Sequence, residues 1–128
     1  LNIMGWNVDP QGFGVIFDRA IPPFAAERIE PAMAQIVQRA NLQLSDIDRF
    51  TCHPGGKKVI EALESALSLG QGALDHERSV LADYGNMSAP TVLFVLERSI
   101  TAGLPSRTLL SAMGPGFTVS CVSLQQAA

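Results

Sequence analysis

The segment Ser88–Leu96, SAPTVLFVL, constrains the fold more than any other part of the sequence. Ser88 is a typical helix N-cap, and Pro90 suits the first turn, where its missing N–H costs no hydrogen bond. The five residues Val92–Leu96 are apolar around the whole circumference of a helix. A helix without a polar face is buried on all sides. The pattern therefore predicts a helix enclosed between two sheets, only part of which this chain supplies.

Strands and helices are expected to alternate on either side of this segment. Ile21–Phe24, IPPF, should break the chain before a helix in which Pro31 marks either the first turn or a kink. Gly70 should stop the second helix, and Asp75 should cap the third. Periodicity and turn residues predict strands at Ile3–Val8, Phe13–Asp18, Arg49–His53, Arg107–Met113 and Phe117–Leu124, and helices at Glu27–Ala40, Val59–Leu67 and His76–Tyr84. This order indicates layered α/β architecture.

Composition excludes several classes of function. The 128 residues carry a net charge of −3 with a pI of about 5.2, which argues against a nucleic-acid surface. No apolar run approaches the roughly 18 residues of a membrane span, and no secretory signal pattern is present. With 47% hydrophobic residues and a mean hydropathy of +0.21, the chain is apolar enough to pack against a larger body. It starts at Leu1 in mid-pattern, so we expect a piece of a longer protein.

Cysteine and histidine usage indicates a reduced, cytoplasmic protein. Cys52 and Cys121 lie in apolar runs without paired spacing, which argues against a disulfide. The two histidines, His53 and His76, are not accompanied by a CxxC pair, so a structural zinc site is not expected.

The stretch FTCHPGG, Phe50–Gly56, places a cysteine beside a histidine at a strand end. Adjacent strand residues point to opposite faces, so Cys52 and His53 are not expected to form a nucleophile pair. Cys52 is interpreted as a core residue. His53 stands where α/β sheets usually bind ligands, although a lone histidine is also commonly structural.

Two lysines follow the glycines in what should be the first turn of a helix. Lys57 and Lys58 oppose the helix dipole, which favours acids at this end. They form either a solvated basic corner or a contact for an anionic ligand with phosphates. The pattern GxxxxGK[ST] of nucleotide-binding loops is absent.

Three further features fit one pocket with His53. Asn86 is either a turn residue or a neutral amide donor for a developing oxyanion. Ser88 either caps the helix or lines the same pocket. The stretch Gly114–Gly116, GPG, is a tight turn that can also bring backbone close to a ligand. A histidine, an amide, a glycine-rich loop and a cationic rim suit acyl chemistry on a CoA thioester.

The combination resembles a known enzyme family. HPGGKKVIEALE, LADYGNMSAPTVLFVLE and GPGFTVSCVSL, in this order, are similar to the C-terminal half of type III polyketide synthases, the chalcone and stilbene synthase family. GWNV and GFGVIFDRAIP fit the same region upstream. The resemblance implies that residues 1–128 are the C-terminal domain of a thiolase-like layered fold, with a mixed sheet and helices on both faces.

The resemblance also implies what the parent enzyme does. It would condense malonyl-CoA onto an acyl-CoA starter with loss of CO2, as a homodimer, without a metal or cofactor. His53 and Asn86 match the catalytic residues that stabilise the enolate, and His53 would also hold a nucleophilic thiolate. Positions that match the pocket or the CoA tunnel are Ser88, Lys58, Gly114, Pro115 and Gly116.

Three departures from the family pattern accompany the resemblance. The nucleophilic cysteine belongs to the N-terminal half, which this chain lacks, and neither Cys52 nor Cys121 matches it. Val15 stands where plant members carry a gatekeeper Phe. Ala112 and Met113 replace the first residues of the usual GFGPG. The alternatives are a ketoacyl-ACP synthase, whose carrier protein would meet the lysines, and a non-catalytic acyl-CoA-binding domain.

Overall fold

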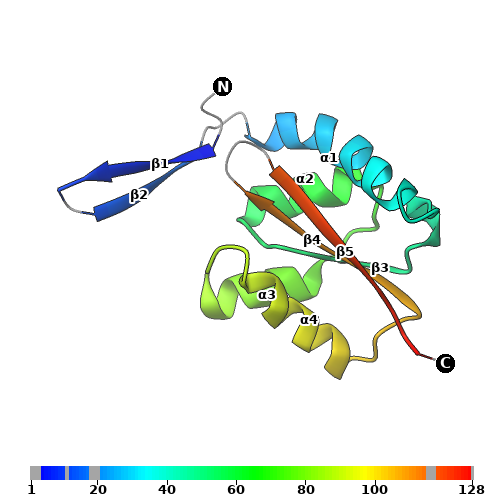
Figure 1. Ribbon diagram of the computed structural model, residues 1–128. Coiled ribbons are helices and arrows are strands. Elements are labelled where there is room, and N and C mark those ends of the chain that lie inside the picture. The colour runs from blue at the N-terminus through cyan, green and yellow to red at the C-terminus, as the bar shows by residue number, and fades with distance from the viewer. Residues whose placement is uncertain (1–3, 11, 18–20, 115–117, 128) are drawn as a thin grey trace.

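The strands of the chain form a two-stranded hairpin and a separate three-stranded sheet. The computed structural model describes residues 4–10, 12–17, 21–114 and 118–127. The hairpin pairs β1 with β2 in antiparallel register, and in Figure 1 it projects to one side of the α/β body. The elements are β1 Met4–Asp9, β2 Gly12–Phe17, α1 Ile21–Gln38, the 3-10 turn η1 Leu44–Asp46, β3 Arg49–Cys52, α2 Lys57–Ala66, α3 Asp75–Tyr84, α4 Thr91–Thr101, β4 Arg107–Gly114 and β5 Thr118–Gln125.

The three-stranded sheet is mixed and has the order β3-β4-β5. β3 runs parallel to β4, with Cys52 opposite Ser111, whereas β4 and β5 are antiparallel. Parallel strands need a long crossover, and here α2, α3 and α4 all lie between β3 and β4 along the chain. The predicted order of strands and helices is confirmed.

Helices cover both faces of this sheet, as predicted. α1 and α2 lie together on one side, and α3 and α4 lie on the other (Figure 1). The apolar core gathers α1, α2, β3 and β4 through buried residues that include Met33, Phe50, Leu63 and Leu109. Cys52 belongs to this core and is fully buried, which confirms its interpretation as a core residue. No helix in the described part of the chain could cross a membrane.

The prediction that α4 is buried on all sides is wrong. Val92 and Val95 are buried, but Leu93 is 58% exposed, Phe94 37% and Ile100 56%. One face of α4 packs against α3, β3 and β4. The opposite face is largely exposed, because the described residues do not supply the second sheet that the pattern predicts.

The predicted N-cap of α4 is also wrong. Ser88 has a φ of +65°, and Pro90 rather than Ser88 is the residue that precedes the helix. The backbone N–H of Ser88 is taken by Asn86 Oδ1, which forms a local turn. The Thr91 hydroxyl, rather than that of Ser88, bonds the backbone at the helix start. It accepts the Met87 N–H at 2.9 Å and donates to the Ser88 carbonyl at 2.6 Å.

Three other helix ends differ from the predictions. α1 begins at Ile21 and includes the IPPF segment, because prolines in a first turn lack only N–H groups that have no intrahelical partner. Asp75 is the first residue of α3 rather than its cap. α2 ends at Ala66, before Gly70: Ser68 adopts a φ of +51° and terminates the helix in a Schellman-type turn.

Candidate functional site

His53 follows β3 directly at the carboxyl end of the parallel strand pair. Its backbone N–H donates to the Ser111 carbonyl of β4 at 2.8 Å, so the pairing of the two strands continues to this residue. The β3 strand therefore ends at Cys52, one residue earlier than predicted. α2 begins at Lys57, only a short turn further along the chain. The backbone around His53 is thus anchored to the sheet on one side and to a helix on the other.

The imidazole of His53 is almost entirely enclosed, with 4% of the residue exposed. Its Nδ1 is buried and has no hydrogen-bond partner among the described residues. A Cβ placed on Gly55 would lie 3.8 Å from Nε2, at ordinary contact distance. Burial lowers the pKa of His53 below its usual value of 6.5. At neutral pH the ring is therefore uncharged and carries one N–H donor.

We predict that His53 titrates below pH 6.5. Between pH 6.5 and its lowered pKa the unfolded chain binds more protons than the folded chain, so the free energy of unfolding should fall as pH decreases through this range. Burial and the charges of Arg49 and Arg98 also lower the pKa of His76. NMR titration of both imidazoles, assigned with a His76→Gln variant, measures the pKa of His53. A value at 6.5 or above would contradict the prediction.

The side chain of Asn86 contacts the loop that carries His53. Asn86 lies between α3 and α4, and its Nδ2 donates to the Gly55 carbonyl at 3.1 Å. Its Oδ1 accepts the Ser88 N–H at 2.9 Å. These two contacts fix which way the amide points. An amide NH2 has a second N–H, so Asn86 can still donate to a bound oxygen atom.

The Gly55 carbonyl is the link that sequence reasoning missed. Gly55 borders His53 Nε2, and its carbonyl accepts the hydrogen bond of Asn86. The two residues in that bond are 31 positions apart. No local pattern signals a pairing at this separation. The structure therefore brings His53 and Asn86 to one place, whereas Ser88 reaches it through its backbone N–H.

The structure describes the remaining predicted site residues in different detail. Lys57 and Lys58 are exposed in the first turn of α2, which has no acidic residue there. Gly114 ends β4 opposite Thr118. Val15 lies in β2 opposite Trp6, and only its backbone is described. Pro115 and Gly116 lie outside the described residues.

The cysteine thiols are poor nucleophiles. Burial raises the pKa of Cys52 to about 12 and that of Cys121 to about 11. The thiolate is the reactive form of cysteine. With these raised pKa values both thiols stay protonated at neutral pH, so neither cysteine can act as the nucleophile beside His53. In the part of the chain that the structure describes, no group of three or more His, Cys, Asp or Glu residues could hold a metal ion.

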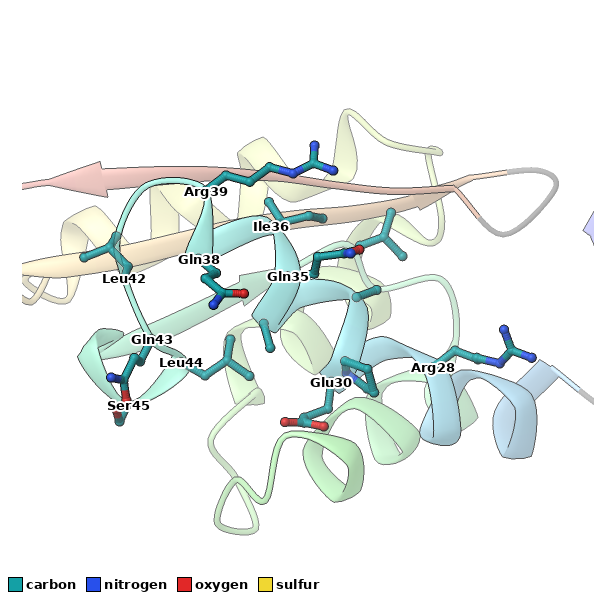
Figure 2. A pocket seen from close by; sticks show the side chains of 14 residues that line it. Arg28, Glu30, Gln35, Ile36, Gln38, Arg39, Leu42, Gln43, Leu44 and Ser45 are labelled. Carbon is teal, nitrogen blue, oxygen red and sulfur yellow. The ribbon is translucent and has the colours of Figure 1, made fainter.

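Two hollows on the surface are lined by residues other than His53 and Asn86. A hollow of about 1210 Å³ is lined by α1 and the loop after it, with Arg28, Gln35, Arg39 and Gln43 among its residues (Figure 2). A second, of about 440 Å³, lies near the start of β3, where Arg49 reaches the surface. Neither of these two hollows is lined by His53 or Asn86.

The sequence of residues 2–127 matches the family described as chalcone and stilbene synthases, C-terminal domain. The chain belongs to this family. The chalcone and stilbene synthase C-terminal domain described above is 37% identical over 127 residues to the 1,3,6,8-tetrahydroxynaphthalene synthase of Streptomyces peucetius subsp. caesius, covering 97% of this chain and 34% of the relative. It is 32% identical over 123 residues to the 3,5-dihydroxyphenylacetyl-CoA synthase of Amycolatopsis balhimycina, covering 94% and 33%.

Solved structures agree with this membership. The crystal structure of 1,3,6,8-tetrahydroxynaphthalene synthase from Streptomyces coelicolor A3(2), a bacterial type III polyketide synthase, matches with a TM-score of 0.86 and 27% identity. The match covers 99% of this chain and 37% of that one. The thiolase-like fold class predicted from the sequence is confirmed. The chalcone and stilbene synthase C-terminal domain spans about a third of the length of the curated relatives it matches.

Proposed function

We propose that residues 1–128 are the C-terminal domain of a type III polyketide synthase that condenses malonyl-CoA with an acyl-CoA starter. The observation that supports the proposal is the hydrogen bond from Asn86 Nδ2 to the Gly55 carbonyl, which joins Asn86 to the loop of the buried His53 and uses only one of the two amide N–H groups. Two hydrogen-bond donors that converge on one point suit an oxyanion that develops during the reaction. Family membership supports the same assignment.

The two donors act on the thioester oxygen of malonyl-CoA. As the bond between the α-carbon and the carboxylate breaks, CO2 leaves and its electron pair moves into the enolate. His53 and Asn86 hydrogen-bond the enolate oxygen, where negative charge develops. The carbanion then attacks the carbonyl carbon of the starter thioester and expels the thiolate that carried it. Donors that need no reorganisation lower the barrier most when water is excluded.

The nucleophilic thiolate is expected to come from an N-terminal half of the same enzyme. Cys52 is excluded because it is buried in the core with a raised pKa, and Cys121 because its pKa is raised as well. A thiolate placed beside His53 would favour the imidazolium and raise the pKa of His53. The ion pair would then form only in the assembled enzyme.

The exposed face of α4 supports the presence of such a second half. Leu93, Phe94 and Ile100 are exposed on this helix, and the Tyr84 ring stands 5.2 Å from that of Phe94. Apolar side chains concentrated on one face are typical of an interface. We assign this face to the N-terminal half, and we expect the full-length enzyme to be a homodimer as in its family.

The substrate contacts extend the same proposal. Lys58 is exposed in the first turn of α2, at the positive end of the helix dipole, and would meet a CoA phosphate. Ser88, Gly114, Pro115, Gly116 and Val15 would line the cavity in which the polyketide grows. The reaction needs CoA thioesters as substrates and no additional cofactor.

Assays with malonyl-CoA and an acyl-CoA starter test the proposed function. We expect condensation by the full-length enzyme and none by residues 1–128 alone, because the oxyanion donors of the isolated chain have no nucleophile to serve. Malonyl-ACP supplied in place of malonyl-CoA is the control for substrate class. Faster turnover of the carrier-linked substrate would indicate a ketoacyl-ACP synthase, and CoA binding by calorimetry without turnover would indicate an acyl-CoA-binding domain.

A further inference from the structure

Glu77 is a fully buried carboxylate that contacts the strand leading to His53. It extends from α3, and its Oε1 accepts the backbone N–H of Cys52 at 2.9 Å. The next N–H along the chain, that of His53, points to the opposite side and donates to the Ser111 carbonyl. The end of β3 is therefore held along both edges, by a side chain on one edge and by β4 on the other.

A second contact connects the same carboxylate to α4. Oε2 of Glu77 lies 3.5 Å from Arg49 Nη2, and Arg49 Nε donates to the Ser99 hydroxyl at 3.0 Å. Burial raises the pKa of Glu77, while the Cys52 N–H and the Arg49 charge act in the opposite direction. One side chain thus ties together β3, α3 and, through Arg49, α4.

The backbone contact is the closer of the two. At 3.5 Å the Arg49 contact is long for a charge-assisted hydrogen bond. In contrast, Arg78 holds Glu64 with two contacts of 2.7 Å between α2 and α3, as a structural ion pair does. We infer from this difference that the acceptor oxygen facing Cys52, rather than the charge facing Arg49, is the important feature of Glu77.

The position of Glu77 connects the two candidate catalytic residues. β3 leads directly into His53, and α3 leads through Gly85 into Asn86. A hydrogen bond from one element to the other therefore fixes the spacing of the two side chains. We propose that Glu77 is a positioning residue that holds the His53 strand against the Asn86 helix, an inference that rests on the function proposed above.

Two substitutions separate the acceptor from the charge. Glu77→Gln keeps an acceptor oxygen at the same reach and removes the charge. Glu77→Asp keeps the charge and withdraws the carboxylate by about one C–C bond, roughly 1.5 Å. We expect the Gln variant of the full-length enzyme to retain the kcat for malonyl-CoA decarboxylation within about threefold. The Asp variant should lose about tenfold to a hundredfold in kcat with little change in KM, because displacement by about 1 Å can have such effects.

Hydrogen exchange provides a readout that does not depend on activity. The amide of Cys52 should exchange at least tenfold faster in the Asp variant and at the wild-type rate in the Gln variant. The control is Asp83→Asn, which removes an exposed carboxylate of the same helix that pairs with Arg98. This control should change neither the amide exchange of Cys52 nor the kcat.

Each outcome decides the proposal. A Gln variant that loses activity while the Asp variant keeps it would assign Glu77 an electrostatic role and overturn the inference. Unchanged exchange of Cys52 in the Asp variant would overturn it as well. If His53→Ala retains full decarboxylation, the proposed function fails, whereas the exchange measurement still tests the contact between Glu77 and Cys52.

Discussion

Replacing His53 by alanine in the full-length enzyme should lower the kcat for malonyl-CoA decarboxylation by about 10²–10³-fold. Loss of one oxyanion donor typically costs ~2.7–4 kcal/mol of transition-state stabilisation. Asn86→Ala should have an effect of similar size, because it removes the second donor and also frees the Gly55 carbonyl. Release of CO2 from malonyl-CoA alone, measured without a starter, isolates this step from condensation.

The decarboxylation experiment has matched controls within the chain. His76→Ala removes the other histidine, which lies on α3. Asn41→Gly removes an amide from a loop residue with a φ of +56°, which glycine adopts freely. Both should retain near wild-type kcat. Near wild-type decarboxylation by each of the two single variants, His53→Ala and Asn86→Ala, would contradict the oxyanion assignment. The double variant should lose less than the product of the single effects, because the residues act as a unit.

Replacing Leu109 by alanine should destabilise the chain by about 2–5 kcal/mol, the usual range for a buried leucine. Leu109 is 1% exposed and lies on β4, between the other two strands of the sheet. The loss combines the transfer of the side chain to water with the cavity that remains. Urea unfolding followed by circular dichroism measures the change in the free energy of unfolding.

The control for this substitution lies on the neighbouring strand. Val122 is 57% exposed on β5. Val122→Ala should therefore change the free energy of unfolding by no more than about 0.5 kcal/mol. Equal destabilisation by the two variants would show that β4 does not form the centre of the core.

The order of the elements was predictable because hydrophobic periodicity is local. The all-apolar run Val92–Leu96 correctly located a helix, but periodicity cannot tell whether the chain itself supplies the cover for each face. Ser88 does not cap α4 because neighbouring side chains bind the backbone of the loop before the helix. Asn86 Oδ1 accepts the Ser88 N–H, and the Thr91 hydroxyl accepts the Met87 N–H. Which side chain takes these positions depends on the fold around the loop rather than on spacing.

The candidate site was predictable only as a set of residue types. That His53 and Asn86 act together is an expectation from the resemblance to a family. Their connection through the Gly55 carbonyl is visible only in the structure. Glu77 could not have been found from the sequence. In HERSVLADY it reads as one more polar residue on a solvated helix face, yet it is fully buried. The carboxylate is explained by the fold: α3 approaches the edge of β3 that does not pair with β4, and Glu77 accepts the Cys52 N–H there.

The parallel pairing of β3 with β4 has a consequence for folding kinetics. The hydrogen bond of Arg107 N–H to Asp48, at the start of this pair, joins residues 59 positions apart. Closing a loop of that length costs chain entropy before any contact compensates it, and such non-local pairings slow folding. The backbone of His53 reaches its final place only when β4 docks. A compact intermediate that already contains the local helices would therefore still lack the oxyanion-binding geometry.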